Sequence, residues 1–264
     1  MSKQDILNHL SPDAQSRMAL ARVLDKADHA RTRNVPAYSQ FLTDGEQGLA
    51  EKALVAAGVD RFRFWGGYEG AERKVCLFLP DWMEDFEPEG EDDPLAAVEV
   101  TAPQEAKLSH RDYLGSMMGL GLSRDGLGDI LAGETGCQVV CLKTALPALL
   151  TQWTEVGRYR VSVRELPLSQ LEPGEGDVKL LHETFQSLRF DAVAAAGFRI
   201  SRAKAASLIS GGHIQLNHLP CVKPDRILEP GDSLTAKGFG KCVLARVTGE
   251  SRKGRIMVEM ERYQ

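Results

Sequence analysis

The chain has 264 residues, of which 43% are hydrophobic and 26% are charged, and its formal net charge is −5. These values are typical of a soluble globular protein and exclude collagen-like, disulfide-dense and fully disordered chains. No apolar stretch approaches the roughly 20 residues that a membrane span needs, so no membrane association is predicted.

The first 58 residues are predicted to be helical. Pro12 marks the start of a helix whose apolar residues recur at helical spacing, and Pro36 breaks that pattern. A further helix is predicted from about Asp44 to Ala57, with Gly58 as its C-terminal stop. This part of the chain, residues 1–58, is expected to form a helical N-terminal region.

Residues 59–170 are predicted to form a small α/β domain of the ferredoxin-like type. Strand-like and helix-like segments are mixed over about 100 residues, as they are in small α/β sandwiches. Strands are expected at about 61–65, 75–79, 95–101, 138–142 and 159–163, with helices from Ser109 and from Lys143.

Two features of this region predict irregular structure. The glycine pairs Gly119-x-Gly121 and Gly126-x-Gly128 indicate turns. Between Asp81 and Asp93 there are eight carboxylates and no basic residue, which predicts an exposed loop, since so many like charges are not buried together.

After a linker at about 171–177, residues 182–264 are predicted to form a separate domain. Two short helices at about 188–196 and 201–210, separated at Gly197, precede a set of short strands. A helical front, an α/β middle and a tail of two helices with a small sheet together predict the α+β fold class.

The charge is unevenly distributed along the chain. Residues 182–264 carry 13 Lys and Arg against 8 Asp and Glu, a net of +5, while the other residues, with 19 basic and 29 acidic side chains, sum to −10. A basic module on an acidic body predicts a localised site for a polyanion.

The second helix of the tail is the best candidate for that site. Ser201 is placed as its N-cap, and Arg202 and Lys204 fall in the first turn, where the helix dipole disfavours cations. Free backbone N–H groups and two cations would together hold a phosphate. The alternative is an ordinary basic surface helix. If the site binds RNA, replacing Arg202 and Lys204 by Glu should weaken binding and leave the fold intact.

The tail resembles the RNA-binding domain named after the fourth small-subunit ribosomal protein, here the S-four domain, over residues 187–242. The motif residues present are Arg189, Asp191, Gly197, Phe198, Ser201, Arg202, Ala205, Leu208, Ile209, Gly211 and Asn217. The resemblance implies a basic face for structured RNA. Its contact candidates are Arg189, Arg199, Ser201, Arg202, Lys204, Asn217, Lys237 and Lys241.

Two further features lie after the tail helices. Arg252, Lys253 and Arg255 form a compact basic turn between two strands, which either clamps a phosphate backbone or is a solvated hairpin tip. Phe239, between basic residues, is either a stacking surface for a base or part of the core.

The front of the chain resembles the bacterial YlmH family. The matching stretches are 66–73, Gly-Gly-Tyr-Glu-Gly-Ala-Glu-Arg, together with 41–42, 46–47, 113–115, 119–121 and 128–130. The order of helical front, α/β middle and S-four tail is also that family's, so the resemblance extends over nearly the whole chain. It implies that the middle domain binds RNA as well.

The resemblance also implies a function. The expected protein is a cytoplasmic, monomeric, non-enzymatic binder of large-subunit ribosomal RNA, with tRNA as a second candidate. Family members act with ribosome-associated quality-control factors on stalled large subunits that retain peptidyl-tRNA. The alternatives are an RNA-modifying enzyme of the pseudouridine synthase or methyltransferase type with an accessory S-four domain, and a structural factor of cell division.

No metal site or cofactor is predicted. Cys137 and Cys141 are interpreted as core residues, and the six histidines have no metal-ligand spacing. The five scattered cysteines and the absence of an apolar leader are typical of a cytoplasmic protein with reduced thiols.

Overall fold

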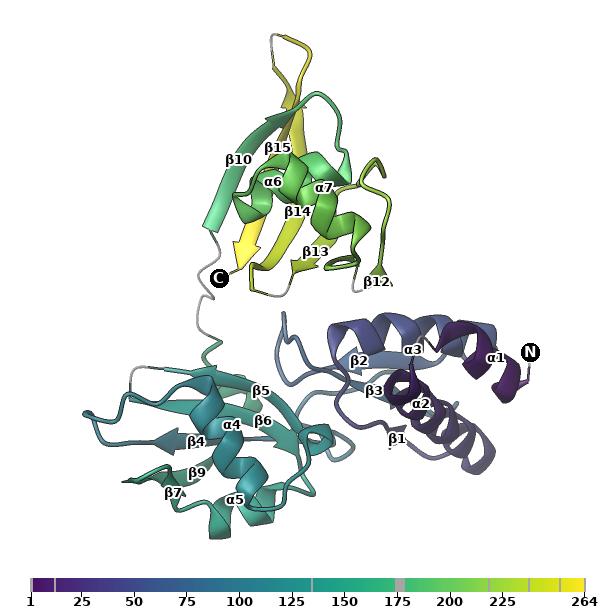
Figure 1. The fold of residues 1–264 in the computed structure, drawn as a ribbon. Helices are drawn as coiled ribbons and strands as arrows, with labels where there is room; N and C mark the ends of the chain where they lie inside the picture. Colours follow the sequence, from purple (N-terminus) through teal and green to yellow (C-terminus); the bar gives the residue numbers. More distant parts are fainter. Residues whose placement is uncertain are drawn as a thin grey trace. The chain divides into compact units, whose positions relative to one another are not determined.

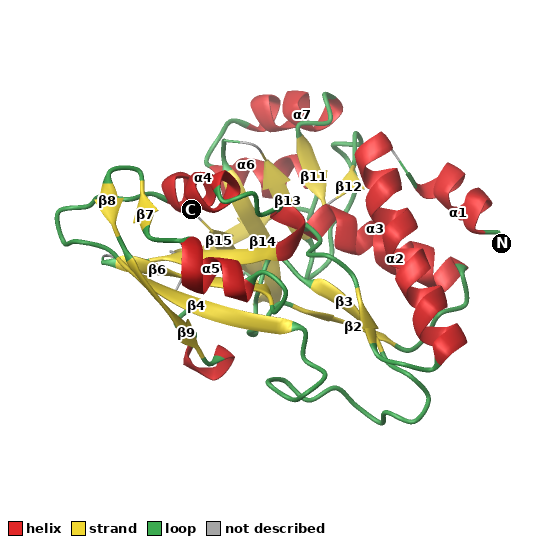
Figure 2. Ribbon diagram, turned by 90° about the horizontal axis from the view of Figure 1, so that it is seen from below, coloured by secondary structure: helices red, strands yellow, loops and turns green. Residues whose placement is uncertain are grey.

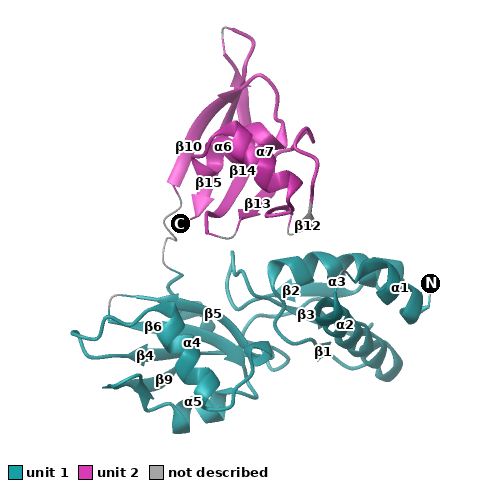
Figure 3. Ribbon diagram, in the orientation of Figure 1, with its two compact units in different colours: residues 1–174 teal, residues 175–264 magenta. Residues whose placement is uncertain are grey.

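A computed structural model describes residues 2–11, 13–133, 135–173, 179–217, 219–236, 238–251 and 253–263. The chain divides into two compact units, residues 1–174 (unit 1) and residues 175–264 (unit 2), which Figure 3 shows in different colours. The structure is of mixed helix and sheet, which confirms the predicted α+β class.

Three helices begin unit 1, and the sequence predicted the second and the third of them. They are α1 (Lys3–Leu10), α2 (Ala14–Arg33) and α3 (Asp44–Ala56), with the short strand β1 (Ala37–Tyr38) after α2. Figure 2 shows them grouped beside strands β2 (Phe62–Trp65) and β3 (Val75–Phe78). The last two strands and β1 form an antiparallel sheet of order β1-β3-β2.

The start of α3 is fixed by a reciprocal cap. The Thr43 hydroxyl accepts a hydrogen bond from the Glu46 backbone N–H, and the Glu46 carboxylate accepts one from the Thr43 backbone N–H at 2.8 Å. Two N–H groups that the helix leaves unpaired are thereby satisfied.

A Thr43→Ala variant is expected to lose about 1 kcal/mol of the free energy of unfolding, because it removes this cap. Urea unfolding of the full chain measures the loss. The control is Thr151→Ala, whose hydroxyl donates within its own helix to the Pro147 carbonyl and should cost under about 0.5 kcal/mol. Equal losses in the two variants would contradict the prediction.

Strand β3 is buried on both of its faces. Val75 and Leu77 point into one apolar cluster, and Cys76 and Phe78 point into the cluster formed by the three N-terminal helices. Side chains alternate across a strand, so a strand with two buried faces must lie between two layers. Here β3 joins the N-terminal helices to the sheet that follows.

That sheet has the ferredoxin-like arrangement predicted from the sequence. Strands and helices follow in the order β4 (Leu95–Thr101), α4 (His110–Gly119), β5 (Leu127–Ala132), β6 (Gly136–Leu142), α5 (Leu146–Gln152) and β9 (Ser162–Leu166). The antiparallel sheet has the order β5-β6-β4-β9, and α4 and α5 lie over one face (Figure 1). Short pieces η1 (Arg124–Gly126), β7 (Glu155–Val156), β8 (Tyr159–Arg160) and η2 (Leu168–Gln170) complete unit 1.

The structure corrects the interpretation of Gly128 as a turn residue. Gly128 lies inside β5, and a Cβ atom there would sit 2.8 Å from two ring atoms of Phe41. The glycine is required because the Phe41 ring packs directly on this backbone, not because the chain turns.

The acidic loop is mostly exposed, as predicted, but Met83, Phe86 and its last residue, Asp93, are buried. Asp93 is 1% exposed, and its carboxylate accepts hydrogen bonds from the Trp65 indole at 3.2 Å and from the backbone N–H groups of Glu89 and Leu95 at 2.9 Å each. These three donors offset the loss of hydration of the buried charge. The loop is therefore folded around one buried carboxylate.

Unit 2 has its own core. It comprises β10 (Lys179–Phe185), α6 (Phe190–Phe198), α7 (Arg202–Ser210), β11 (Ile214–Leu216), β12 (Leu219–Pro220), β13 (Ser233–Ala236), β14 (Gly240–Glu250) and β15 (Ile256–Tyr263). The sheet has the order β10-β15-β14-β13-β11-β12, with α6 packed against its centre. Strand β10, which pairs with β15 along its full length, was not predicted.

Gly197 does not separate the two helices of unit 2. It lies in the last turn of α6, and a Cβ atom there would sit 2.6 Å from the Cys242 sulfur and 3.2 Å from the Met260 methyl group. The glycine lets α6 pack closely on the sheet. In the described part of the chain, no helix combines the length and apolar character that a membrane crossing requires.

Candidate nucleic-acid interface

The Arg-x-Asp pair at the start of α6 forms an ion-pair network that reaches α7. Asp191 is 5% exposed, and its carboxylate accepts hydrogen bonds from Arg189 at 3.1 Å and from Arg202 at 3.0 Å. Arg189 is the N-cap residue of α6, and Arg202 is the first residue of α7. Asp191 therefore joins the two helices, while both guanidinium groups keep part of their surface in solvent.

The carboxyl group of Asp191 stays ionised in this network. Burial raises its pKa, but the hydrogen bonds and charges of Arg189 and Arg202 lower the pKa by more, so it lies below the usual value of 3.8. Replacing Arg202 by Glu would set a second carboxylate against this buried one. We therefore expect the fold to tolerate a Glu substitution at Lys204 but not at Arg202.

Lys204 lies at the exposed start of α7, where Ser201 acts as the predicted N-cap. The Ser201 hydroxyl accepts a hydrogen bond from the Lys204 backbone N–H at 3.2 Å. The Lys204 ammonium lies 5.3 Å from the centroid of the Phe239 ring, a distance typical of a cation–π contact. Its charge remains at the surface.

Phe239 packs against Phe198 with a ring-centroid distance of 6.0 Å, and it contacts the core of unit 2. It is half-buried, so it belongs to the edge of the core. The contact brings together the ends of α6, α7 and the turn before β14. With Arg199, Lys204 and Lys241, the partly exposed Phe239 ring defines what we call the aromatic–cationic face.

Arg199 and Lys241 flank the two rings in the chain. Arg199 is exposed and ends α6 in the left-handed conformation, with φ of 54°. Lys241, at the start of β14, places its ammonium 5.6 Å from the centroid of the Tyr263 ring. Because Arg199 directly follows Phe198 and Lys241 lies two residues after Phe239, the backbones of both cations lie close to the contact between these two rings.

Asn217 is used within the protein. Its side-chain amide donates to Asp232 at 2.6 Å, and its side-chain oxygen accepts from the Ser233 N–H at 2.8 Å. With φ of 48°, it sits in the left-handed region that asparagine tolerates better than most residues. The side chain fixes the turn after β11, and its role in RNA binding stays a prediction.

The basic turn between β14 and β15 is only partly available to a ligand. Lys253 is exposed, whereas Arg255 donates to the Thr184 carbonyl at 2.7 Å and so ties the turn to β10. The other two predicted basic contacts, Lys237 and Arg252, lie outside the described residues.

One pair of cations in unit 2 was missed by sequence reasoning. Lys223 and Arg226 are exposed in the loop between β12 and β13, which contacts the start of α6 because the Arg226 carbonyl accepts a hydrogen bond from the Phe190 N–H at 2.8 Å. Val222 and Ile227 beside them are 57% and 59% exposed. The sequence signal for this pair was the presence of a cation on each side of the turn residues Pro224-Asp225.

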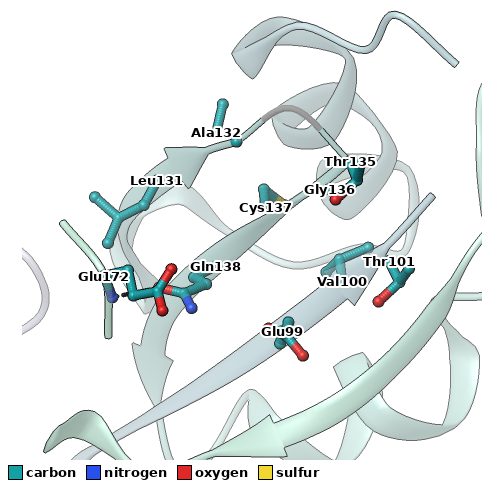
Figure 4. Close-up of a pocket in the computed structure, with 11 residues that line it drawn as sticks. Glu99, Val100, Thr101, Leu131, Ala132, Thr135, Gly136, Cys137, Gln138 and Glu172 are labelled. Carbon is teal, nitrogen blue, oxygen red and sulfur yellow. Dashed lines mark hydrogen bonds between the residues drawn. The ribbon is translucent and has the colours of Figure 1, made fainter. Parts of the chain in front are cut away.

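Unit 1 has an open polar pocket lined by residues of β4, β5 and β6, among them Glu99, Leu131 and Gln138 (Figure 4). Glu99 forms an ion pair with Arg164, and the Gln138 side-chain oxygen accepts from the Glu172 N–H at 2.7 Å. The charge of Glu99 is therefore paired, no basic residue is among the described residues that line the pocket, and the Glu172 carboxylate disfavours a phosphate there.

Cys137 and Cys141 are core residues, as predicted. Cys137 and Cys141 are buried, and burial raises the pKa of both thiols to about 12. Within the described ranges, no three His, Cys, Asp or Glu side chains are grouped so as to hold a metal ion.

The chain matches two protein-family models. One, described as "Putative RNA-binding domain in YlmH", matches residues 88–170, and the other, described as "S4 domain", matches residues 188–234. The first range contains the ferredoxin-like sheet, and the second contains both helices of unit 2.

Two known proteins are similar over large parts of the chain. A protein of Bacillus subtilis (strain 168) named "Ribosome-associated protein quality control protein P2" is 34% identical over 227 residues, which is 86% of this chain and 87% of that protein. The solved structure "Cell division protein ylmH from Streptococcus pneumoniae" has a TM-score of 0.50 and 22% identity, covering 61% of this chain and 96% of that one. At that identity, the likeness concerns the fold.

Proposed function

The chain belongs to the YlmH family of RNA-binding proteins, and from this premise we propose that it binds large-subunit ribosomal RNA through unit 2. We further propose that the protein acts on stalled large subunits that retain peptidyl-tRNA. The tRNA is then a second ligand. The name of the Bacillus subtilis relative supports a role in ribosome-associated quality control.

The aromatic–cationic face is the observation that carries the proposal. Arg199 and Lys204 are exposed there without a carboxylate partner among the described residues, while Lys241 lies beside them. Cations that no carboxylate neutralises are available to phosphate, and releasing the counterions of RNA favours binding.

We further propose that the protein is non-enzymatic. An RNA-modifying enzyme of the pseudouridine synthase type needs a catalytic Asp, and the comparable Arg-x-Asp here ends in Asp191. That carboxylate is buried and bound by two arginines, which supports a structural role for it.

Crosslinking of the full chain to purified large ribosomal subunits, followed by mapping of the crosslinked peptides, tests the proposal. Peptides that contain residues 199–204 and 238–241 are expected to carry nucleotides. Crosslinks confined to unit 1, or no association with large subunits, would contradict RNA binding through unit 2.

A further inference from the structure

Unit 1 contains two neighbouring arginines whose guanidinium groups donate hydrogen bonds to backbone carbonyls. They are Arg73, in the loop before β3, and Arg124, in η1. We propose that this pair, the arginine cluster, binds a phosphate group of RNA and so supplies a second RNA contact outside unit 2. The proposal rests on the proposed function and adds to it a site in the acidic unit.

The Arg73 guanidinium is fixed by carbonyl oxygens. It donates to the Leu127 carbonyl at 3.0 Å, to the Arg124 carbonyl at 3.0 Å and to the Phe41 carbonyl at 3.4 Å. Carbonyl groups satisfy N–H donors but carry no net charge, so the positive charge of Arg73 is not neutralised by them. Burial accordingly lowers the pKa of Arg73.

Arg124 lies against this first charge. Its guanidinium donates to the Gly128 carbonyl at 3.1 Å and is half-buried. Burial and then the charge of Arg73 lower the pKa of Arg124, against the opposing charge of Asp129, to about 10. Both arginines are thus protonated at neutral pH, and their like charges repel each other.

The carboxylates around the pair are engaged elsewhere. Asp129 accepts from the Tyr68 hydroxyl at 2.8 Å and from the Glu72 and Arg73 backbone N–H groups at 2.7 and 3.0 Å. Asp125 pairs with Arg22 at 2.8 Å. In the described part of the chain, neither arginine of the cluster forms an ion pair.

Glu46 and His110 complete the charged surroundings. Glu46 acts at long range on Arg73, and its carboxylate caps α3. Burial, and then the charge of Arg124, lower the pKa of His110, so it adds no positive charge at neutral pH. The charges of Glu46, Asp129 and Asp125 favour the protonated form of Arg73, and that of Asp129 favours the protonated form of Arg124. These carboxylates offset part of the positive charge of the pair from a distance, without an ion pair to either arginine among the described residues.

A phosphate is the anion that this arrangement favours. An anion between the two guanidinium groups relieves their repulsion, and the planar fork of arginine matches the oxygens of a phosphate. Arg124 also lies within the range that matches the family model described as an RNA-binding domain. An acidic protein segment is the competing ligand and is distinguished by the test below.

The test is the affinity of the full chain for purified bacterial large-subunit ribosomal RNA over a series of salt concentrations. An Arg124→Gln variant is expected to bind several-fold more weakly, with the log–log salt slope flattened by about 0.7–0.9 for one lost phosphate contact. An Arg124→Lys variant should keep the slope, because it keeps the charge. The control is Lys52→Gln, which removes an exposed charge on α3 and should change neither quantity.

Thermal unfolding shows whether each variant is folded, and crosslinked peptides covering residues 105–127 give a second readout. An unchanged affinity and slope in folded Arg124→Gln, without crosslinks in this range, would overturn the inference and favour a protein ligand. If unit 2 still crosslinks to the RNA in that case, the proposed function stands. If the parent chain does not bind the RNA at all, the proposed function itself has failed.

Discussion

An Asp191→Asn variant is expected to lose about 2–3 kcal/mol of the free energy of unfolding of unit 2. The substitution keeps the shape of the side chain but removes the charge that binds Arg189 and Arg202. Hydrogen bonds to charged groups contribute about 1.5–3 kcal/mol each, and the partial exposure of both arginines reduces the sum of the two. Hydrogen exchange of the α6 and α7 amides in the full chain measures the free energy of unfolding of unit 2 separately from that of unit 1.

The same variant has a defined pH dependence. The folded-state pKa of Asp191 is lowered from 3.8, so its contribution is fully present above about pH 4 and is lost as the pH falls through the folded value. The gap in stability between parent and variant should therefore close in acid. Asp225→Asn, an exposed carboxylate nearby, is the control and should change unfolding by less than about 0.5 kcal/mol. A gap that is independent of pH would argue against the ion pairs as its cause.

A double variant, Lys204→Glu and Lys241→Glu, is expected to lower the affinity for large-subunit ribosomal RNA by at least about tenfold near 0.1 M salt. Two phosphate contacts are lost and two repulsions are added, and the log–log salt slope should flatten by roughly 1.5. Filter binding of the full chain over a salt series measures both quantities.

The matched control removes the same kind of charge from the other unit: Lys52→Glu on α3 should leave affinity and slope unchanged. Melting of each variant establishes that unit 2 remains folded. If the folded double variant keeps its affinity, the aromatic–cationic face does not contact RNA. If Lys52→Glu weakens binding equally, the effect is one of net charge and not of a site.

Much of the fold was predicted from local sequence signals. The errors arose at positions whose structure is determined by residues distant in the sequence. Helices α2 to α7 and strands β4 and β6 were predicted because proline, capping residues and apolar spacing act within a few residues, whereas strand β5 was not predicted. Strand β10 was missed because it forms only by pairing with β15, which lies far away in the chain. Gly128 was misread because its neighbour Phe41 lies far away in the sequence.

The sequence predicted which cations belong to the candidate site, but it did not predict the different role of each one. Composition and motif named Arg202 and Lys204 together, but only the fold shows that Arg202 faces the buried Asp191 while Lys204 remains at the surface. The arginine cluster could not be inferred from spacing, because Arg73 and Arg124 are 51 residues apart and meet through backbone carbonyls.

The two buried faces of β3 also bear on how unit 1 comes apart. Isolating residues 88–170 would strip Phe41, Val75 and Leu77 from the sheet and leave an apolar surface formed by Leu95, Ala97, Val140 and Leu166 in water. Cutting the chain after residue 58 would already remove Phe41 from that surface. Exposed apolar surface of this kind promotes aggregation. We expect the N-terminal helices and the ferredoxin-like sheet to melt in one cooperative step, so that a shortened protein meant to isolate the sheet would precipitate where residues 1–173 stay in solution.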